Sequence, residues 1–399
     1  MLHGKSGSTI LGLGASLDLG ARTFGIGART IIGARTFGLC ALVIALSCAA
    51  NPDASASSGA FSSSYQAYQT ALETGDEQAV ETAAANAYKL GEQEYGVADT
   101  NTAALAMNWA SALLALPAEP NSKRKAEHKQ AAYTLYQQAF SIREGLSGKE
   151  SVDVLDPLLG MANSSETPEK AKQHFERAID IAENSGQSLL VAYVKTDAFN
   201  YLSKTHLYTN TVKRYAFDAY DTYVKELPAD SIARVKATFT LGAVQFAHKH
   251  YDKAEPLLLE VIKQFDALKF THPYALSAHA YLVEMYEREG ESDKSTAHCV
   301  AIGSMQPWSD TQEQTPIYRI APEYPRSAAQ KGKSGWVEVA FKVDTNGFVK
   351  EPKVLDSKGG SGFEKTSLAA LEKWRYAPKF VDGQPVVGET MVRLYYELR

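Results

Sequence analysis

Residues 336–349 read WVEVAFKVDTNGFV, and this stretch sets the fold of the C-terminal part of the chain. Every second residue from Val337 to Val343 is apolar, a period of two that predicts a β-strand with one buried face. The next four residues, DTNG, include Asn and Gly, which adopt positive φ at little cost. We therefore expect the chain to reverse there and to return as a second strand over residues 348–354.

A helix and a last strand are expected after this hairpin. Pro352 lies in the second strand and indicates that this strand frays or forms an edge. Ser361 to Glu364 have the spacing of a capping box, which opens a helix. Apolar and polar residues alternate again from Met391 onward. The side chains expected to face inward there are Val392, Leu394, Tyr396 and Leu398. Residues 317–399 are thus predicted to form a small α+β domain, a three-stranded antiparallel sheet with helices on one face.

Residues 65–302 have a helical pattern instead of a β pattern. Small and aromatic side chains recur there at i, i+3/i+4 and i+7, and turn signals interrupt them about every 15 to 20 residues. Paired helices of this length predict an all-α solenoid. The chain is therefore expected to be multidomain, with the polar residues 303–316 as the linker between the solenoid and the α+β domain.

The solenoid segment resembles tetratricopeptide (TPR) repeats. Leu241-Gly242 matches the Leu-Gly pair in the first helix of that repeat, and Ala254, Leu258 and Val261 follow at the family's spacing of small, bulky and small residues. The resemblance implies helices that approach to about 8–10 Å and a concave face that binds a peptide or a protein. It does not identify that protein partner.

Residues 1–50 have the pattern of an export signal. Arginines precede an apolar run over Leu39–Leu46, and small residues follow it. That run is too short to cross about 30 Å of hydrocarbon comfortably, so a cleaved signal peptide is favoured over a retained membrane anchor. The Leu46-Ser47-Cys48 sequence leaves lipidation of Cys48 open as a third outcome. Residues 51–64, rich in Ser and Ala, are expected to be a linker.

Charge is unevenly spread along the 399 residues, whose formal net charge is −5. Residues 51–317 carry 23 basic against 35 acidic side chains, and residues 318–399 carry 14 against 10. Nucleic-acid binding depends on basic surface, so the acidic middle argues against a nucleic-acid partner. Hydrophobic residues make up 45% of the chain and charged residues 22%, which excludes a polytopic membrane protein and a fully disordered chain.

No enzyme motif occurs in the sequence. It contains no Gly-rich phosphate loop, HExxH, paired CxxC or GxSxG nucleophile elbow. His248 and His250 are two residues apart, a spacing too weak to predict a metal site. Cys299 is the only cysteine beyond the predicted signal, and its apolar neighbours predict a buried side chain and not a nucleophile. We therefore expect a protein that is not an enzyme, with no catalytic residue, no cofactor and no metal.

Residues 317–398 resemble the C-terminal domain of TonB proteins. The residues that carry the resemblance are Pro322-Glu323-Tyr324-Pro325, the alternating strand from Val337 to Val343, Trp374-Arg375-Tyr376 and Gly383-Gln384-Pro385. TonB-type proteins transmit energy from a proton-driven motor in the inner membrane to outer-membrane receptors that import siderophores, vitamin B12 and similar cargo. The resemblance implies a periplasmic location and TonB-dependent receptors as partners, without naming the receptor or the cargo.

The resemblance also implies a binding site. In that family the last strand of the sheet pairs with a short extended segment of the receptor, the TonB box, and the Tyr-Pro segment lies near the same peptide. An edge strand leaves backbone N–H and C=O groups unpaired, and an extended guest completes the ladder. The predicted edge residues are Thr390, Met391, Val392, Arg393, Leu394, Tyr395, Tyr396 and Glu397. The predicted contacts from the Tyr-Pro segment are Pro322, Tyr324 and Pro325.

Two departures from the family leave two functions open. TonB-type transducers keep a membrane helix with a polar motif that engages the motor, whereas residues 36–52 are short and contain no His. The family's Pro-rich spacer, which extends about 3.1 Å per residue, is replaced by the helical array. The protein is either an energy transducer, coupled to the motor directly or through another protein, or a non-energising periplasmic scaffold that uses the same domain for protein–protein interaction.

Overall fold

The computed structural model describes residues 52–266, 272–305 and 314–397. This part of the chain divides into two compact units, the first ending at Glu226 and the second beginning at Leu227. The predicted export signal, Cys48 included, lies outside the described residues. Within the described ranges, no helix combines the length and the apolar character that a membrane crossing requires.

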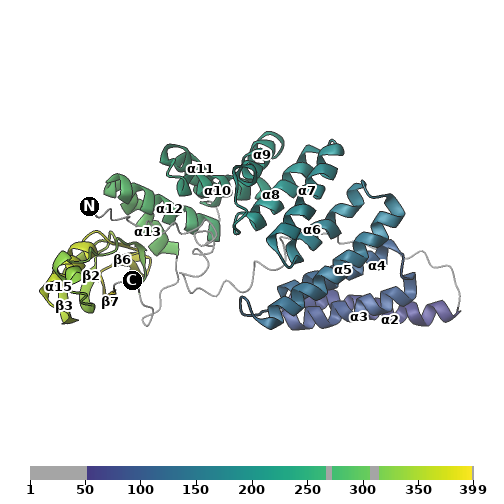
Figure 1. Cartoon of the computed structure of the whole chain (residues 1–399), viewed down its shortest axis with the longest axis horizontal. Helices are drawn as coiled ribbons and strands as arrows, with labels where there is room; N and C mark the ends of the chain where they lie inside the picture. Colours follow the sequence, from purple (N-terminus) through teal and green to yellow (C-terminus); the bar gives the residue numbers. More distant parts are fainter. Residues whose placement is uncertain (1–51, 267–271, 306–313, 398–399) are drawn as a thin grey trace. The chain divides into compact units, whose positions relative to one another are not determined.

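The described residues of the first unit form a series of helices (Figure 1). The elements are α2 (Pro52–Thr74), α3 (Glu77–Tyr95), α4 (Thr100–Ala115), α5 (Lys123–Ser147), the 3₁₀ turn η2 (Val152–Val154), α6 (Leu155–Ser164), α7 (Pro168–Asn184), α8 (Ser188–Leu202) and α9 (Asn210–Glu226). The side chains of Asp76, Ser122 and Thr167 accept hydrogen bonds from amides in the first turns of α3, α5 and α7. Such caps satisfy amides that have no partner within the helix. The predicted all-helical character of this region is confirmed.

The structure corrects the prediction of a linker over residues 51–64. Helix α2 begins at Pro52, and Phe61 is buried in a cluster with Ala87 of α3 and Leu105 of α4. A Ser- and Ala-rich composition is typical of a linker, but Ala also favours helix, and a buried aromatic side chain anchors the helix to its neighbours. Packing of Phe61 therefore makes this segment helical, although its composition is that of a linker.

Small residues allow the helices of the first unit to approach closely. A Cβ atom at Gly160 of α6 would lie 2.2 Å from the ring of Tyr136 on α5. Tyr136 is buried, and its hydroxyl shares a hydrogen bond of 2.7 Å with Ser111 of α4. Tyr136 of α5 thus joins its two neighbours: its ring packs on Gly160 of α6, and its hydroxyl bonds to Ser111 of α4. The assignment of these repeats to the TPR type stays a prediction.

The second unit begins with helices and ends with strands (Figure 1). Its elements are α10 (Ile232–Ala247), α11 (Tyr251–Phe265), α12 (Pro273–Glu289), α13 (Ser292–Met305), β1 (Pro316–Tyr318), α14 (Arg326–Gln330), β2 (Gly335–Val343), β3 (Val349–Lys358), α15 (Ser361–Leu371), β4 (Arg375–Tyr376), β5 (Lys379–Val381), β6 (Gln384–Val386) and β7 (Gly388–Tyr396). The four repeat residues Leu241, Ala254, Leu258 and Val261 are all buried.

A three-stranded antiparallel sheet with the strand order β3-β2-β7 lies at the centre of the C-terminal domain. The alternating residues Val337, Val339, Phe341 and Val343 of β2 are buried, as their period predicts. They pack against Phe363 and Leu371 of α15. Two short antiparallel ladders, β1 with β4 and β5 with β6, accompany this sheet. The predicted α+β fold is confirmed.

The linker predicted over residues 303–316 overlaps the described elements only at its two ends. Helix α13 continues to Met305 and β1 begins at Pro316, while residues 306–313 lie outside the described ranges. Ile302 of α13 belongs to an apolar cluster that also contains Tyr318 of β1. Within the described residues, the C-terminal domain and the last two helices therefore share a core.

Asp197 of α8 gives the first unit a pH dependence that can be measured. Burial raises the pKa of its carboxyl from the ordinary value of 3.8 to about 6, although the Asn163 amide donates a hydrogen bond to it at 2.8 Å. Between about pH 4 and pH 6 the folded state keeps a proton that the unfolded state has released, so the free energy of unfolding falls as the pH rises. We expect Asp197→Asn to raise it near pH 7 by about 2 kcal/mol.

Urea denaturation of the two proteins from about pH 4 to pH 7 measures this difference. Asp221→Asn, an exposed position on α9 of the same unit, is the control and should leave the pH profile unchanged. If Asp197→Asn changes the free energy of unfolding equally at about pH 4 and at pH 7, a raised pKa of Asp197 is not the cause of the change.

Candidate functional site: the free edge of the C-terminal sheet

The sheet has two outer strands, and each leaves one side of its backbone open. Strand β2 lies between β3 and β7, and within residues 314–397 no further strand pairs with either of them. Unpaired backbone groups at such an edge bind an added strand unless the sequence prevents it. The two edges differ in this respect.

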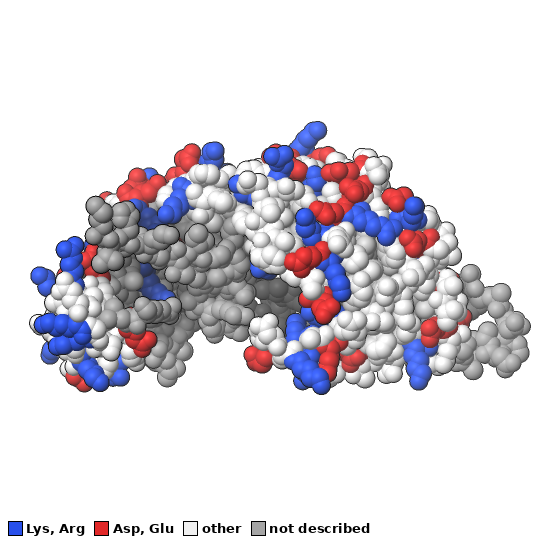
Figure 2. Space-filling model, viewed as in Figure 1, with Lys and Arg blue, Asp and Glu red and all other residues white. Residues whose placement is uncertain are grey.

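The β3 edge is protected against pairing. Its register against β2 shifts at two places, Glu351 has a φ of 51°, and Pro352 has no N–H to donate. Figure 2 shows basic side chains gathered on the side of the C-terminal domain that carries β3 and α15. The lysines of β3 are Lys350, Lys353 and Lys358. Bulges, proline and lysine are the devices by which natural sheets avoid association through an edge.

The β7 edge has none of these devices. Its nine residues, Gly388–Tyr396, pair with β2 from Val343 back to Gly335 without a shift of register. The strand contains no proline, and its one basic side chain, Arg393, forms an ion pair with Glu338 of β2. Strand β7 therefore presents a long, regular row of backbone donors and acceptors.

The side chains of β7 alternate as predicted. Val392 and Leu394 are half-buried against the core, and Tyr396 is buried. On the opposite face Met391 and Tyr395 are 61% and 66% exposed. Of the three remaining predicted edge residues, Thr390 is half-buried, and Arg393 and Glu397 are exposed. Because Val392 and Leu394 lie next to the open edge, a guest strand on that edge would complete their burial.

Arg393 is held in place on the outer face of the sheet. It donates to Glu338 at 2.8 Å through Nε, and its guanidinium carbon lies 4.3 Å from the centre of the Trp336 ring. The hydrogen bond with Glu338 raises the pKa of Arg393. A guest strand would thus meet a positive charge that already has a counter-charge, with exposed apolar side chains on both sides of it.

The Tyr-Pro segment lies at the C-terminal end of β7. The Tyr324 ring packs edge-on against Tyr396, with ring centres 5.7 Å apart, and its hydroxyl donates to the Lys333 carbonyl at 2.5 Å. Pro325 lies against Gly362 in the first turn of α15, and Pro322 is half-buried. Tyr324 and Pro325 therefore hold the segment against the domain, a role that the sequence did not indicate. Their contact with a bound peptide stays a prediction.

Tyr396 fixes the same end of β7 to α15. Its hydroxyl donates to the Phe363 carbonyl at 3.0 Å and shares hydrogen bonds with Thr366 at 2.8 Å and Ser367 at 2.7 Å. The side chain of this predicted edge residue thus points into the domain, and only its backbone is available at the edge. Strand β7 is held by β2 along one side and by α15 at one end.

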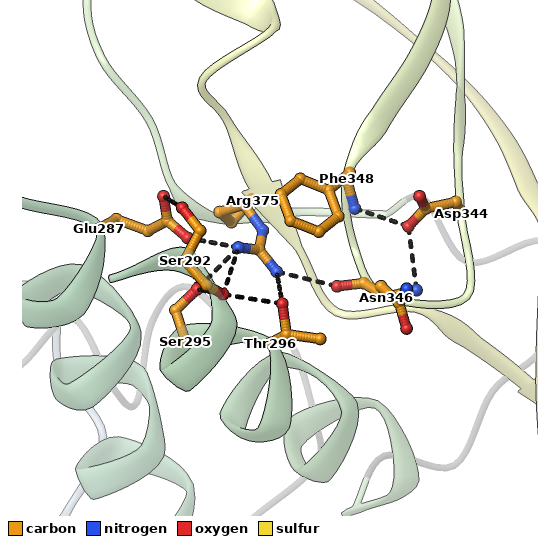
Figure 3. A network of polar contacts seen from close by, with 8 residues as sticks. All are labelled: Glu287, Ser292, Ser295, Thr296, Asp344, Asn346, Phe348 and Arg375. Atoms are coloured by element: carbon orange, nitrogen blue, oxygen red, sulfur yellow. Dashed lines mark hydrogen bonds and ion pairs between the residues drawn. The ribbon is translucent and has the colours of Figure 1, made fainter. Parts of the chain in front are cut away.

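Sequence reasoning missed one residue of structural importance, Arg375 of β4. It lies between Trp374, whose indole donates to the Ile320 carbonyl at 2.8 Å, and the buried Tyr376. Arg375 is itself only 1% exposed and contacts α12 and α13 (Figure 3). A charged residue between two core aromatic residues was the available signal, because a charge is buried only where it finds partners.

No metal site competes with this edge in the described part of the chain. Over those residues, no three side chains among His, Cys, Asp and Glu come together as metal ligands would. His279 and His298 share one hydrogen bond of 2.8 Å between their Nδ1 atoms, and burial lowers the pKa of each to about 4. Both rings are therefore neutral near pH 7, with one donating to the other.

Comparison with known proteins identifies the domain that carries this edge. Residues 320–398 match the family model described as Gram-negative bacterial TonB protein C-terminal. The C-terminal domain is of the TonB type. Proteins of this family are transducers and adaptors and not enzymes.

Two curated relatives and one solved structure resemble the same part of the chain. Protein TonB of Vibrio cholerae serotype O1 is 28% identical over 80 residues, which are 20% of this chain and 33% of that protein. Protein TonB of Pseudomonas aeruginosa is 30% identical over 81 residues, 20% of this chain and 23% of that protein. The match thus spans a third of the first relative and under a quarter of the second. The solution NMR structure of the Pseudomonas aeruginosa TonB CTD covers 22% of this chain and 90% of its own, with 26% identity and a TM-score of 0.20.

We expect Tyr396→Phe to loosen β7. The change removes one partner of the Phe363 carbonyl and the Tyr396 partner of the buried Ser367 hydroxyl, so the free energy of opening β7 should fall by about 1–3 kcal/mol. Hydrogen exchange of the β7 amides measures it. Tyr395→Phe is the matched control, because that ring is 66% exposed and its loss should stay within about 0.5 kcal/mol. Equal losses in the two variants would refute the anchoring role of the Tyr396 hydroxyl.

Proposed function

We propose that this protein is a TonB-like adaptor of the cell envelope that binds TonB-dependent outer-membrane receptors along β7. The observation that supports this most is the difference between the two sheet edges. Strand β3 is bulged, contains Pro352 and carries lysines, whereas β7 is regular and open. A domain that must accept one foreign strand without polymerising needs one protected edge and one free edge.

Backbone pairing would supply the recognition. An extended receptor segment along β7 exchanges N–H···O=C bonds with it, each contributing about 0.5–1.5 kcal/mol net. Its inward side chains cover Val392 and Leu394, and its outward side chains lie beside Met391, Arg393 and Tyr395. Because the main chain makes most of the contacts, one edge can serve several receptors of different sequence.

Charge would assist the encounter. Residues 318–399 carry 14 basic and 10 acidic side chains, and Arg326, Lys331 and Lys333 are exposed near the Tyr-Pro segment. A positive potential raises the rate of association with an acidic receptor segment and loses this effect as salt is added. Arg393 contributes less than its charge suggests, because Glu338 already balances it.

The proposal extends to the rest of the chain. The helices recruit a protein partner, and through it, or directly, the domain is coupled to the inner-membrane motor and to the import of siderophore-type or similar cargo. The protein then works in the periplasm, exported by its N-terminal segment or held at a membrane by that segment or by a lipid on Cys48.

Proline substitutions in β7 test the edge. Successive amides of a strand point to opposite sides, so one of Val392→Pro and Arg393→Pro removes an N–H from the β2 ladder and the other removes one from the open edge. We expect the variant that loses an N–H from the open edge to keep its native circular dichroism and to bind a TonB-box peptide at least about tenfold more weakly. Calorimetric titration of the full chain measures the affinity.

Leu355→Pro is the matched control on the other edge. Leu355 has no partner in the register of β3 with β2, so proline there removes no ladder bond and should leave the affinity unchanged. Unchanged affinity in both β7 variants would rule out pairing through this strand.

Gene deletion separates the two functions that the sequence leaves open. An energy transducer is required for uptake of siderophores or vitamin B12, so its deletion abolishes uptake. A scaffold would bind the same peptide, but its deletion would leave uptake intact. Uptake of labelled cargo in the deletion strain, with and without the gene restored, distinguishes them.

A further inference from the structure

One buried arginine joins the C-terminal domain to helices α12 and α13 (Figure 3). Arg375 extends from β4, and its guanidinium forms an ion pair with Glu287 of α12. It also donates to the Ser295 hydroxyl at 2.7 Å and to the Thr296 hydroxyl at 2.9 Å, both on α13. The side chains of Arg375 and Glu287 are 1% and 9% exposed, so the pair is shielded from water.

The same guanidinium holds the hairpin turn between β2 and β3. It donates to the Asn346 carbonyl at 2.9 Å, and its central carbon lies 3.7 Å from the centre of the Phe348 ring. Asp344 accepts hydrogen bonds from the amides of Asn346 and Phe348, both at 2.9 Å, which fixes the shape of the turn. One side chain thus connects two helices with the turn of the sheet.

Apolar packing surrounds this polar network. The cluster consists of Leu276, Val283, Cys299, Ile302, Tyr318 and Ala377. It combines residues of α12 and α13 with residues of β1 and of the segment after β4. Burial raises the pKa of Cys299 to about 12, which agrees with the predicted packing role and not with a nucleophile.

Two glycines allow the close approach. A Cβ atom at Gly303 of α13 would lie 2.5 Å from the carbonyl oxygen of Pro378. A Cβ atom at Gly347 would lie 2.1 Å from the carbonyl oxygen of Tyr376, and the φ of Gly347 is 84°. Glycine within a helix costs about 1 kcal/mol relative to Ala. Gly303 therefore makes α13 less stable as a helix but allows the Pro378 carbonyl to lie against it.

We infer that α12 and α13 form a docking surface for the TonB-type domain of the same chain, and that Arg375 makes helices α10–α13 and this domain one cooperative body. An apolar contact alone would tolerate several docked positions. A buried guanidinium tolerates only the position in which its counter-charge and its acceptors are all present, because any other leaves a charge buried without a partner. The inference does not depend on what binds at β7.

Docking leaves the proposed binding edge connected to the helices. Val343 at the end of β2 pairs with Gly388 at the start of β7, and the chain passes from Val343 directly into the turn that Arg375 holds. If the proposed function is correct, a pull on a receptor strand at β7 reaches α12 and α13 through the sheet and this joint. The helices would then move with the receptor-binding edge.

Hydrogen exchange of the full chain tests the joint. We expect Arg375→Met to lower the protection of amides in β2, β4 and α13 together by at least about 100-fold, because Glu287 is left buried without its counter-charge, with only the Ser292 and Ser295 hydroxyls donating to it. The double variant Arg375→Met with Glu287→Met removes both charges and should recover most of the protection. Gly303→Ala should also lower the protection of β4, although Ala is the better helix former.

Arg393→Met is the matched control. It removes an Arg–Glu pair and an Arg–aromatic contact from the same domain, but on its exposed face, so protection should change by less than about fivefold. The inference is wrong if Arg375→Met lowers protection in β2 while α13 keeps its original protection, or if the two arginine variants behave alike. If Arg375→Met lowers the protection of β2, β4 and α13 together, but the unaltered chain does not bind the TonB-box peptide, the joint is supported and only the receptor proposal is refuted.

Discussion

The guanidinium of Arg375 places the strictest constraint on the second unit. A charge removed from water is tolerated where it meets a counter-charge and most of its donors find acceptors, and among the Arg375 nitrogens Nε alone has no acceptor within the described residues. Glu287 supplies the counter-charge from α12, α13 supplies two hydroxyls, and the hairpin turn supplies the carbonyl of Asn346. Because these groups belong to different elements, the helices, β4 and the turn can take their places only together.

This constraint bears on which part of the sheet is available to a partner. The turn between β2 and β3 lies against β4 and α13, and the Tyr376 carbonyl of β4 leaves no room for a side chain at Gly347. Strand β3 is irregular and charged, and one side of β7 is occupied by β2. The outer side of β7 is what remains. The candidate site is therefore a row of backbone groups, which explains why it involves neither a pocket nor a cluster of reactive side chains.

Sequence patterns predicted the elements better than their boundaries. The alternation from Val337 to Val343 predicted the buried face of β2, because the period of two is a property of an extended chain. The two linkers, residues 51–64 and 303–316, were predicted from composition. The first segment is helical from Pro52, since a Ser-rich segment becomes helical when it has a surface to pack on. Most of the second lies outside the described residues, and only its ends belong to α13 and β1. The role of Arg375 was missed because its helical partners lie 79 to 88 residues away.

Local sequence sufficed for the helical periods and for the turn at Asp344 to Gly347, since each depends on residues a few positions apart. It also sufficed for the resemblance to TonB, which is a series of short motifs between Pro322 and Pro385. Three further properties emerged only from the folded chain. The domain shares a core with α12 and α13, Tyr324 packs inward, and the edge of β7 is regular while that of β3 is bulged. These properties depend on which surfaces stay uncovered after packing. Packing brings together residues that are distant in the chain, and no local pattern records such contacts.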